Sequence, residues 1–251
     1  MTRKAKYITS PQTKVIDNEN FDSLISVVLF AENHGYRMKS YGPISLMKIE
    51  GKTLIERQID TIKATFKNFE IILCVGFETQ KIVEFVKDNF TDINIRVVEN
   101  QMHFTSNCCE SARLCLSNIN NDKILFCNGG VLITPECLRS INYNENSIIF
   151  QEEDEHKDFN IGAIHDAGDR LVSLGLGVKK SVWSEILYLS RKKAVKSMYS
   201  IMSNPEYKNR FMFEAINELM EHNEVIFAIE PKGVPIIKIN NIKTLKRITK
   251  I

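Results

Sequence analysis

The sequence predicts an α/β protein with a doubly wound, mostly parallel sheet and a small antiparallel appendage. Short β-branched apolar runs, typical of strands buried on both faces, alternate with amphipathic stretches of helical spacing. Strand–helix–strand repeats of this kind imply right-handed crossovers and parallel pairing. The chain has 251 residues, of which 43% are hydrophobic and 25% charged, so it can bury the core of one globular domain.

The first half carries this alternation most clearly. A turn at Glu50-Gly51 leads into Thr53, which we expect to be a helix N-cap with Glu56 as its capping-box partner. Strands are expected at 25–31, 70–75, 93–98 and 123–127, with helices starting at 54, over 79–90, and from Ser106 or Asn107 through 116.

The second half changes character. Residues 148–151 and a hairpin that turns at 166–169 indicate antiparallel strands. Helices are expected over 182–202 and 206–222, strands over 224–229 and 234–239, and a last helix from about 242. We expect 1–23 to be a polar N-terminal extension and 24–251 to form a single domain.

The composition limits the classes of binding partner and the cell compartment to expect. A net charge of +2 gives no reason to expect nucleic acid or an anionic membrane. No apolar stretch reaches membrane-spanning length, and the N-terminus lacks the apolar segment of a secretory signal. The six cysteines show neither CxxC pairing nor zinc spacing, which favours reduced, buried thiols and a cytoplasmic location.

Four segments carry a resemblance to a known family. They are 30–38, 43–59, Asn100 with 106–111, and 128–131. Together they resemble the sugar-phosphate and phosphocholine-type nucleotidyltransferases, and the likeness extends over roughly 24–250. The resemblance implies a Rossmann-like, glycosyltransferase-A-like fold and an enzyme that joins a nucleoside triphosphate to a phosphorylated acceptor.

The resemblance also implies site residues. In the family, a glycine-rich loop after the first strand lets backbone N–H groups approach phosphates, and an arginine neutralises them. Arg37 and Asn240 match catalytic positions. The positions implied for nucleotide binding are Ala31, Asn33, Gly35, Arg37, Gly76, Asn100, Ser106 and Asn107.

The chain departs from the family pattern at several of these places. Asn33 replaces a loop glycine beside Glu32, and Ile44 replaces a phosphate-binding lysine. Gly130 and Asn240 stand where the family has the two metal-binding aspartates, and Lys238 replaces a third carboxylate. Because Mg²⁺ needs anionic oxygen ligands, we assign no metal ligands.

Plain structural roles compete with these assignments. Gly130 fits a tight turn, Gly35 and Arg37 fit a turn and a surface arginine, and Ser106 with Asn107 fits a helix cap. His34 and His103 lie in loops expected to face the site, where single histidines are usually surface residues.

Two functions follow. The favoured one is a pseudoenzyme, a nucleotidyltransferase-like protein with lost or much reduced catalysis that serves as a nucleotide-binding, regulatory or assembly module, with a protein partner or a second copy. The alternative is an active enzyme that joins CTP or UTP to a sugar phosphate or amino-alcohol phosphate and releases pyrophosphate. It would need Mg²⁺ and replacement acids such as Glu32, Glu99 or Glu110. A glycosyltransferase is a third reading, but 128–130 lacks the acidic motif it needs.

Overall fold

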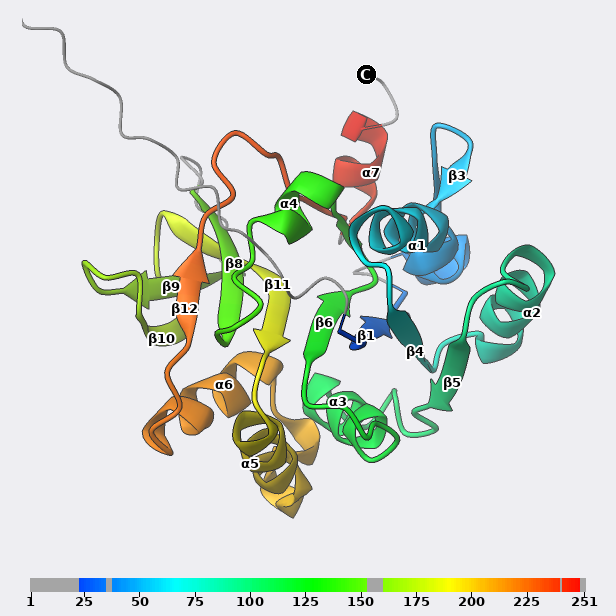
Figure 1. Ribbon diagram of the computed structural model, residues 1–251. Helices are drawn as coiled ribbons and strands as arrows, with labels where there is room; N and C mark the ends of the chain where they lie inside the picture. The colour runs from blue at the N-terminus through cyan, green and yellow to red at the C-terminus, as the bar shows by residue number, and fades with distance from the viewer. Residues whose placement is uncertain (1–22, 35–37, 153–159, 240, 249–251) are drawn as a thin grey trace, which may run out of the picture.

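A computed structural model describes residues 23–34, 38–152, 160–239 and 241–248. Its centre is a nine-stranded sheet (Figure 1). Four parallel strands from the first half form one side of the sheet, in the order β6-β1-β4-β5. They are β1 (Ile25–Phe30), β4 (Phe69–Val75), β5 (Ile95–Glu99) and β6 (Ile124–Asn128), all close to their predicted positions.

The second half extends this sheet with antiparallel strands. β11 (Ser181–Leu189) pairs antiparallel with β6, with β8 (Ser147–Glu152) and, at one position, with β9 (Ile161–His165). The predicted hairpin is present as β9 and β10 (Leu171–Leu176), and β12 (Phe227–Ile229) lies parallel to β8. The antiparallel part is thus joined to the parallel part through one strand, β11.

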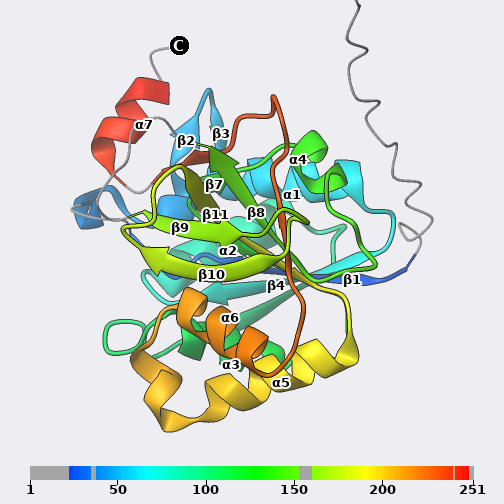
Figure 2. The same ribbon diagram turned by 90° about the vertical axis from the view of Figure 1, so that its left-hand side faces the viewer.

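Helices cover both faces of the sheet, as Figures 1 and 2 show. α1 (Leu54–Thr65), α2 (Thr79–Asn89) and α4 (Pro135–Arg139) pack on one face. α3 (Cys108–Leu116), α5 (Lys192–Ser203) and α6 (Met212–Glu221) pack on the other. Side chains alternate along a strand, so Val27 of β1 enters the first core and Val28 the second. This is the doubly wound arrangement that the sequence predicts.

Small elements complete the fold next to β6. β7 (Val131–Leu132) pairs antiparallel with β13 (Ile237–Lys238), which brings the end of the chain to the turn after β6. A small hairpin joins β2 (Lys48–Ile49) to β3 (Lys52–Thr53). Short 3-10 helices span Lys39–Tyr41, Ile44–Leu46 and Pro205–Asn209, and α7 spans Ile242–Ile248.

The predicted caps are confirmed. The Thr53 hydroxyl accepts a hydrogen bond from the Glu56 N–H at 3.2 Å, and the Glu56 carboxylate accepts one from the Thr53 N–H at 2.6 Å. Asn107 is the N-cap of α3, where its side-chain oxygen accepts from the Cys108 N–H. These local signals fix where two helices begin.

The helix predicted over 182–202 is wrong in its first part. Residues 181–189 form β11, and helix α5 begins only at Lys192. The segment Ser181-Val-Trp-Ser-Glu-Ile-Leu-Tyr-Leu189 is apolar on both faces, so its pattern does not separate a buried strand from a buried helix. Pairing with β6 and β8 on either side decides for the strand.

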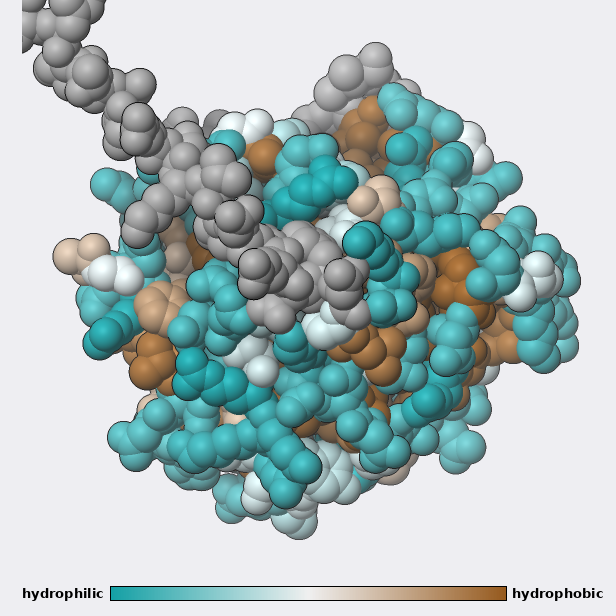
Figure 3. Space-filling view, viewed as in Figure 1, coloured by the Kyte–Doolittle hydropathy of each residue, from teal (hydrophilic) through white to brown (hydrophobic). Residues whose placement is uncertain are grey.

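The surface is ordinary for a folded domain. The face shown in Figure 3 is mostly hydrophilic, with small apolar patches. No helix in the described part of the chain has the length and apolar character that crossing a bilayer requires. All six cysteines are unpaired, and all except the half-buried Cys108 are buried.

Candidate functional site

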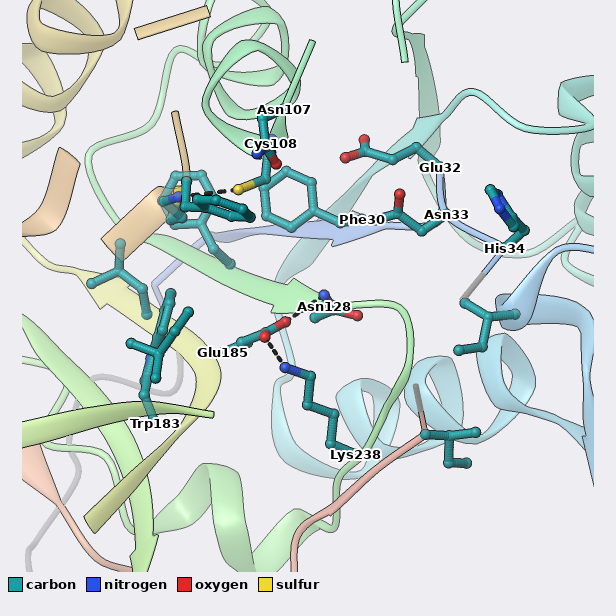
Figure 4. A pocket seen from close by; sticks show the side chains of 17 residues that line it. Phe30, Glu32, Asn33, His34, Asn107, Cys108, Asn128, Trp183, Glu185 and Lys238 are labelled. Atoms are coloured by element: carbon teal, nitrogen blue, oxygen red, sulfur yellow. Dashed lines mark hydrogen bonds and ion pairs between the residues drawn. The ribbon is translucent and has the colours of Figure 1, made fainter. Parts of the chain in front are cut away.

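A cavity of about 370 Å³ opens at the carboxyl ends of β1 and β6, where ligands bind in doubly wound sheets. Its walls come from β1, β6, β11, β13, the loop after β1, and the starts of α3 and α6 (Figure 4). Much of the lining is apolar: Phe30 and Phe126 lie with their rings nearly parallel, 6.2 Å apart. Trp183, Phe211 and Met212 add further apolar surface.

One end of the cavity is charged. Glu185 of β11 accepts a hydrogen bond from the Asn128 side-chain amide at 2.5 Å and forms an ion pair with Lys238 of β13 (Figure 4). The two charged side chains are only 18% and 32% exposed. Glu185 has a φ of +58° and lies where the β11–β8 register shifts, between Trp183 and Ile186. A bulge therefore turns this carboxylate towards the cavity.

The turn after β6 holds Asn128 in place. Its side-chain oxygen accepts a hydrogen bond from the Gly130 N–H at 2.8 Å. From α1, the buried Gln58 amide donates to the main-chain oxygens of Asn128 and Val131 at 2.9 and 2.8 Å. These contacts fix the turn against the helix behind it.

Both glycines of this turn lie against backbone. A Cβ on Gly129 would collide with the Phe30 carbonyl oxygen. A Cβ on Gly130 would lie 2.8 Å from the Ile239 carbonyl oxygen and 3.2 Å from Ile44 Cδ1. A side chain at the position that matches the family's first aspartate therefore has no room in this arrangement.

The described residues do not fit a magnesium ion at this end of the cavity. Glu32 and Glu185 are the carboxylic acids in its described lining, and no group of three potential metal ligands exists among the described residues. Glu185 is already engaged by an ammonium and an amide, and the Lys238 cation beside it would repel a divalent ion.

Two of the three acids considered as replacements, Glu110 and Glu99, lie outside the cavity lining. Glu110 binds Arg113 through both carboxylate oxygens at 2.8 Å, and this contact lowers its pKa. Glu99 is exposed at the end of β5, outside the cavity lining. Glu32 does line the cavity, but only 4% of its surface is exposed.

Glu32 is better understood as a buried carboxylic acid. Burial raises its pKa, and hydrogen bonds from Cys74 and Ser111 oppose the shift. The Cys74 thiol donates to its Oε2 at 2.9 Å. Desolvation by burial is therefore the main influence on the pKa of this carboxyl.

The structure describes six of the eight nucleotide-binding positions that the resemblance implies. Asn33 and Asn107 line the cavity. Ala31 is buried and its N–H donates to the Cys74 carbonyl. Gly35 and Arg37 lie outside the described residues, as does Asn240, the second catalytic position.

Of the other positions, Gly76 directly follows β4, and Asn100 and Ser106 belong to the loop after β5. The buried Asn100 amide donates to the hydroxyls of Ser106 and Ser111 at 3.0 and 2.8 Å. A Cβ on Gly76 would lie 2.7 Å from the His103 Cβ, so the space above this glycine is filled by that side chain. Asn100, Ser106 and Gly76 are not among the cavity-lining residues.

The sequence reasoning assigned no role to Glu185, Trp183 or Asn128. Glu185 and Trp183 lie in a segment that the sequence predicts as a helix, so the prediction does not place their side chains at the cavity. One signal was present: Lys238 replaces a carboxylate at a site position, and a cation there needs an acid partner. His34 lines the cavity, and so does Ile44, which stands where the family has a phosphate-binding lysine.

Comparison with known proteins places this geometry in context. No protein-family model matches the chain. A curated relative, the bifunctional protein GlmU of Methanococcus maripaludis, is 25% identical over 194 residues, which are 76% of this chain and 45% of the relative. The chain thus spans about half the length of that relative.

Solved structures match over most of the chain. The inositol-1-phosphate CTP transferase from T. maritima gives a TM-score of 0.72 at 13% identity, covering 90% of this chain and 94% of that one. CTP:phosphocholine cytidylyltransferase from Streptococcus pneumoniae gives 0.73 at 13% identity, with 90% and 98% coverage. A UDP-glucose pyrophosphorylase complexed with UDP-glucose gives 0.73 at 10% identity, with 91% and 98% coverage. The chain therefore has the fold of the sugar-phosphate and phosphocholine-type nucleotidyltransferases, as the resemblance predicted.

Proposed function

We propose that the chain is a cytoplasmic binding module with a nucleotidyltransferase fold, in which metal-dependent transfer is lost or much reduced. Its cavity takes a nucleotide or a small phosphorylated molecule, and binding serves a regulatory or assembly role with a protein partner or a second copy. Six unpaired cysteines support a reducing compartment.

One observation carries the proposal: the Glu185–Lys238 ion pair occupies the charged end of the cavity. Phosphoryl and nucleotidyl transfer depend on a metal ion to neutralise the charge that develops on the phosphate oxygens. Here the available carboxylate is neutralised by a lysine, and the Ile239 carbonyl leaves no room for a side chain on Gly130. The cavity and its apolar walls remain suited to binding a ligand without a metal ion.

The size of the cavity agrees with a small ligand. About 370 Å³ falls near the lower end of the range for ligand pockets, roughly 300–1,000 Å³. The apolar wall of Phe126, Trp183 and Met212 suits an organic group, while the charged end suits a phosphate.

An active enzyme is the second candidate, supported by the relatives. The structural neighbours include proteins described as CTP transferases and pyrophosphorylases. In this reading CTP or UTP is joined to a sugar phosphate or amino-alcohol phosphate with Mg²⁺ bound. Such activity requires the Glu185–Lys238 pair to open so that the carboxylate becomes available to the metal.

A turnover assay separates the two candidates. The purified chain is incubated with Mg²⁺, CTP or UTP, and glucose 1-phosphate or phosphocholine, and pyrophosphate release is measured. We expect release close to the protein-free rate. The Streptococcus pneumoniae CTP:phosphocholine cytidylyltransferase serves as the positive control. Robust Mg²⁺-dependent release would overturn the loss of catalysis.

Binding is measured on the same samples. Trp183 is the single tryptophan of the chain and lies in the cavity wall, so its fluorescence reports occupancy directly. We expect saturable changes with at least one of these four compounds. A flat response to all of them would reject the cavity as their binding site.

A further inference from the structure

We infer that Lys238 is a built-in cation that binds the phosphate of the ligand without a divalent ion. The inference rests on the proposed binding function and names the chemistry of the site: an organic phosphate is held by an ammonium that Glu185 positions. The site would bind its ligand equally well when divalent ions are removed.

The position of Lys238 supports this role. β13 pairs with β7 immediately after the Asn128–Gly130 turn, and the pairing places Lys238 opposite Val131. From there its side chain reaches across to Glu185 at the charged end of the cavity (Figure 4). In a doubly wound sheet, ligands bind at this carboxyl edge of the strands.

The hydrogen-bonding capacity of the two side chains supports it as well. Both oxygens of Glu185 are engaged, one by Lys238 and the other by Asn128. An ammonium has three donors, and among the described residues Glu185 is its hydrogen-bonding partner. Lys238 therefore has donors left for phosphate oxygens.

Partial burial of Lys238 strengthens its attraction to the ligand phosphate. The Lys238 and Glu185 side chains are 32% and 18% exposed, at one end of a largely apolar cavity. In such surroundings a charge acts over a lower effective dielectric than in bulk water. The acid partner holds the lysine in one geometry before the ligand arrives, so less side-chain entropy is lost on binding.

The arrangement predicts opposite effects of the two charges. Lys238 attracts the phosphate, whereas Glu185 offsets part of that attraction. If Glu185 were a metal ligand, its removal would weaken binding in Mg²⁺. If Lys238 is the anion-binding group, replacing Glu185 by the neutral glutamine should strengthen binding in EDTA.

The experiment titrates CTP, UTP, glucose 1-phosphate, phosphocholine and inorganic pyrophosphate against the full chain in EDTA and in Mg²⁺. Trp183 fluorescence and calorimetry provide the dissociation constants. We expect wild-type affinity to change less than about twofold between EDTA and Mg²⁺. Lys238→Gln should weaken binding about 10- to 100-fold, the range for losing a hydrogen bond to a charged group. Glu185→Gln should tighten it about three- to tenfold.

Two variants separate binding from folding. Lys238→Arg keeps the cation and should retain most of the affinity. Lys87→Gln removes one positive charge from an exposed position of α2 and should leave affinity unchanged. Thermal unfolding of each variant shows whether the fold is intact, and the gain expected for Glu185→Gln is a result that a damaged fold would not produce.

The outcomes distinguish this inference from the proposed function. Binding that requires Mg²⁺, or binding in EDTA that Lys238→Gln leaves unchanged, overturns the built-in cation but not the binding module. Mg²⁺-dependent turnover overturns the loss of catalysis. No binding by any probe to wild type or to Glu185→Gln overturns both.

Discussion

At the scale of single residues, the turn after β6 shows how tightly the site is built. Gly130 needs no positive φ, yet a Cβ there would meet the Ile239 carbonyl oxygen at 2.8 Å. We expect Gly130→Ala to lower the free energy of unfolding by about 1–3 kcal/mol, because β7 and β13 must move apart. Urea unfolding provides the measurement.

Gly175→Ala is the matched control, since among the described residues its Cβ would meet Val178 Cγ2 alone, at an ordinary 3.7 Å. It should change stability by less than about 0.5 kcal/mol. Gly130→Asp should give no Mg²⁺-dependent pyrophosphate release. A Gly130→Ala protein as stable as the wild type would contradict the close contact between Gly130 and the Ile239 carbonyl oxygen.

Glu32 gives a pH-dependent prediction. Burial raises its folded-state pKa above the ordinary 4.5, so the folded protein holds this proton more tightly than the unfolded chain. The stability that Glu32 contributes is therefore complete below pH 4.5 and is lost as the pH rises through the folded-state pKa.

Glu32→Gln cannot titrate, so its free energy of unfolding relative to wild type should increase as the pH rises from about 4.5. The slope is at most about 1.4 kcal/mol per pH unit for one group. Denaturant unfolding between pH 4.5 and 8 measures it. Glu84→Gln at an exposed position of α2 is the charge-matched control, and a flat difference for Glu32→Gln would contradict a raised pKa.

At the scale of elements, α1 holds the turn after β6 through the side chain of Gln58. Gln58 is 1% exposed and donates to two main-chain oxygens in the β6–β7 connection. Gln58→Met keeps the volume but leaves both acceptors without this donor. We expect a loss of about 2–4 kcal/mol, because an unpaired buried acceptor costs about 1–3 kcal/mol.

Gln80→Met on α2 is the control, since the exposed Gln80 amide donates a hydrogen bond to the exposed Glu84 carboxylate of the same helix. Unfolding in urea and the Trp183 titration are measured together. A stable Gln58→Met protein with unchanged ligand affinity would show that α1 does not hold the turn.

Elements also show what the sequence could predict. Thr53 with Glu56 and Asn107 are local hydrogen-bonding signals, and both helix starts were predicted correctly. The strand around Glu185 was not, because its side chains are buried on both faces and long-range pairing with β6 and β8 decides its conformation. The Glu185–Lys238 pair, which joins residues 53 positions apart, was missed with it.

At the scale of the whole molecule, residues of both halves pack together in the cores on the two faces of the sheet. A single cluster contains Val28 and Ile72 from the first half and Met198 and Leu219 from the second. β11 pairs with β6 on one side and with β8 on the other, so neither half keeps a complete sheet alone. We propose on this basis that 24–251 is one folding unit.

This predicts one cooperative transition. Leu219→Ala in α6 removes a fully buried side chain and should cost about 2–5 kcal/mol. In a single unit, the slowest-exchanging amides of β4 should lose protection by the same free energy as those of β11, although β4 lies in the other half. Hydrogen exchange measures both, with Val172→Ala on the exposed face of β10 as the control. If β11 amides lost protection while β4 amides kept theirs, the halves would be separate units, and a site built from both would need a different account of its rigidity.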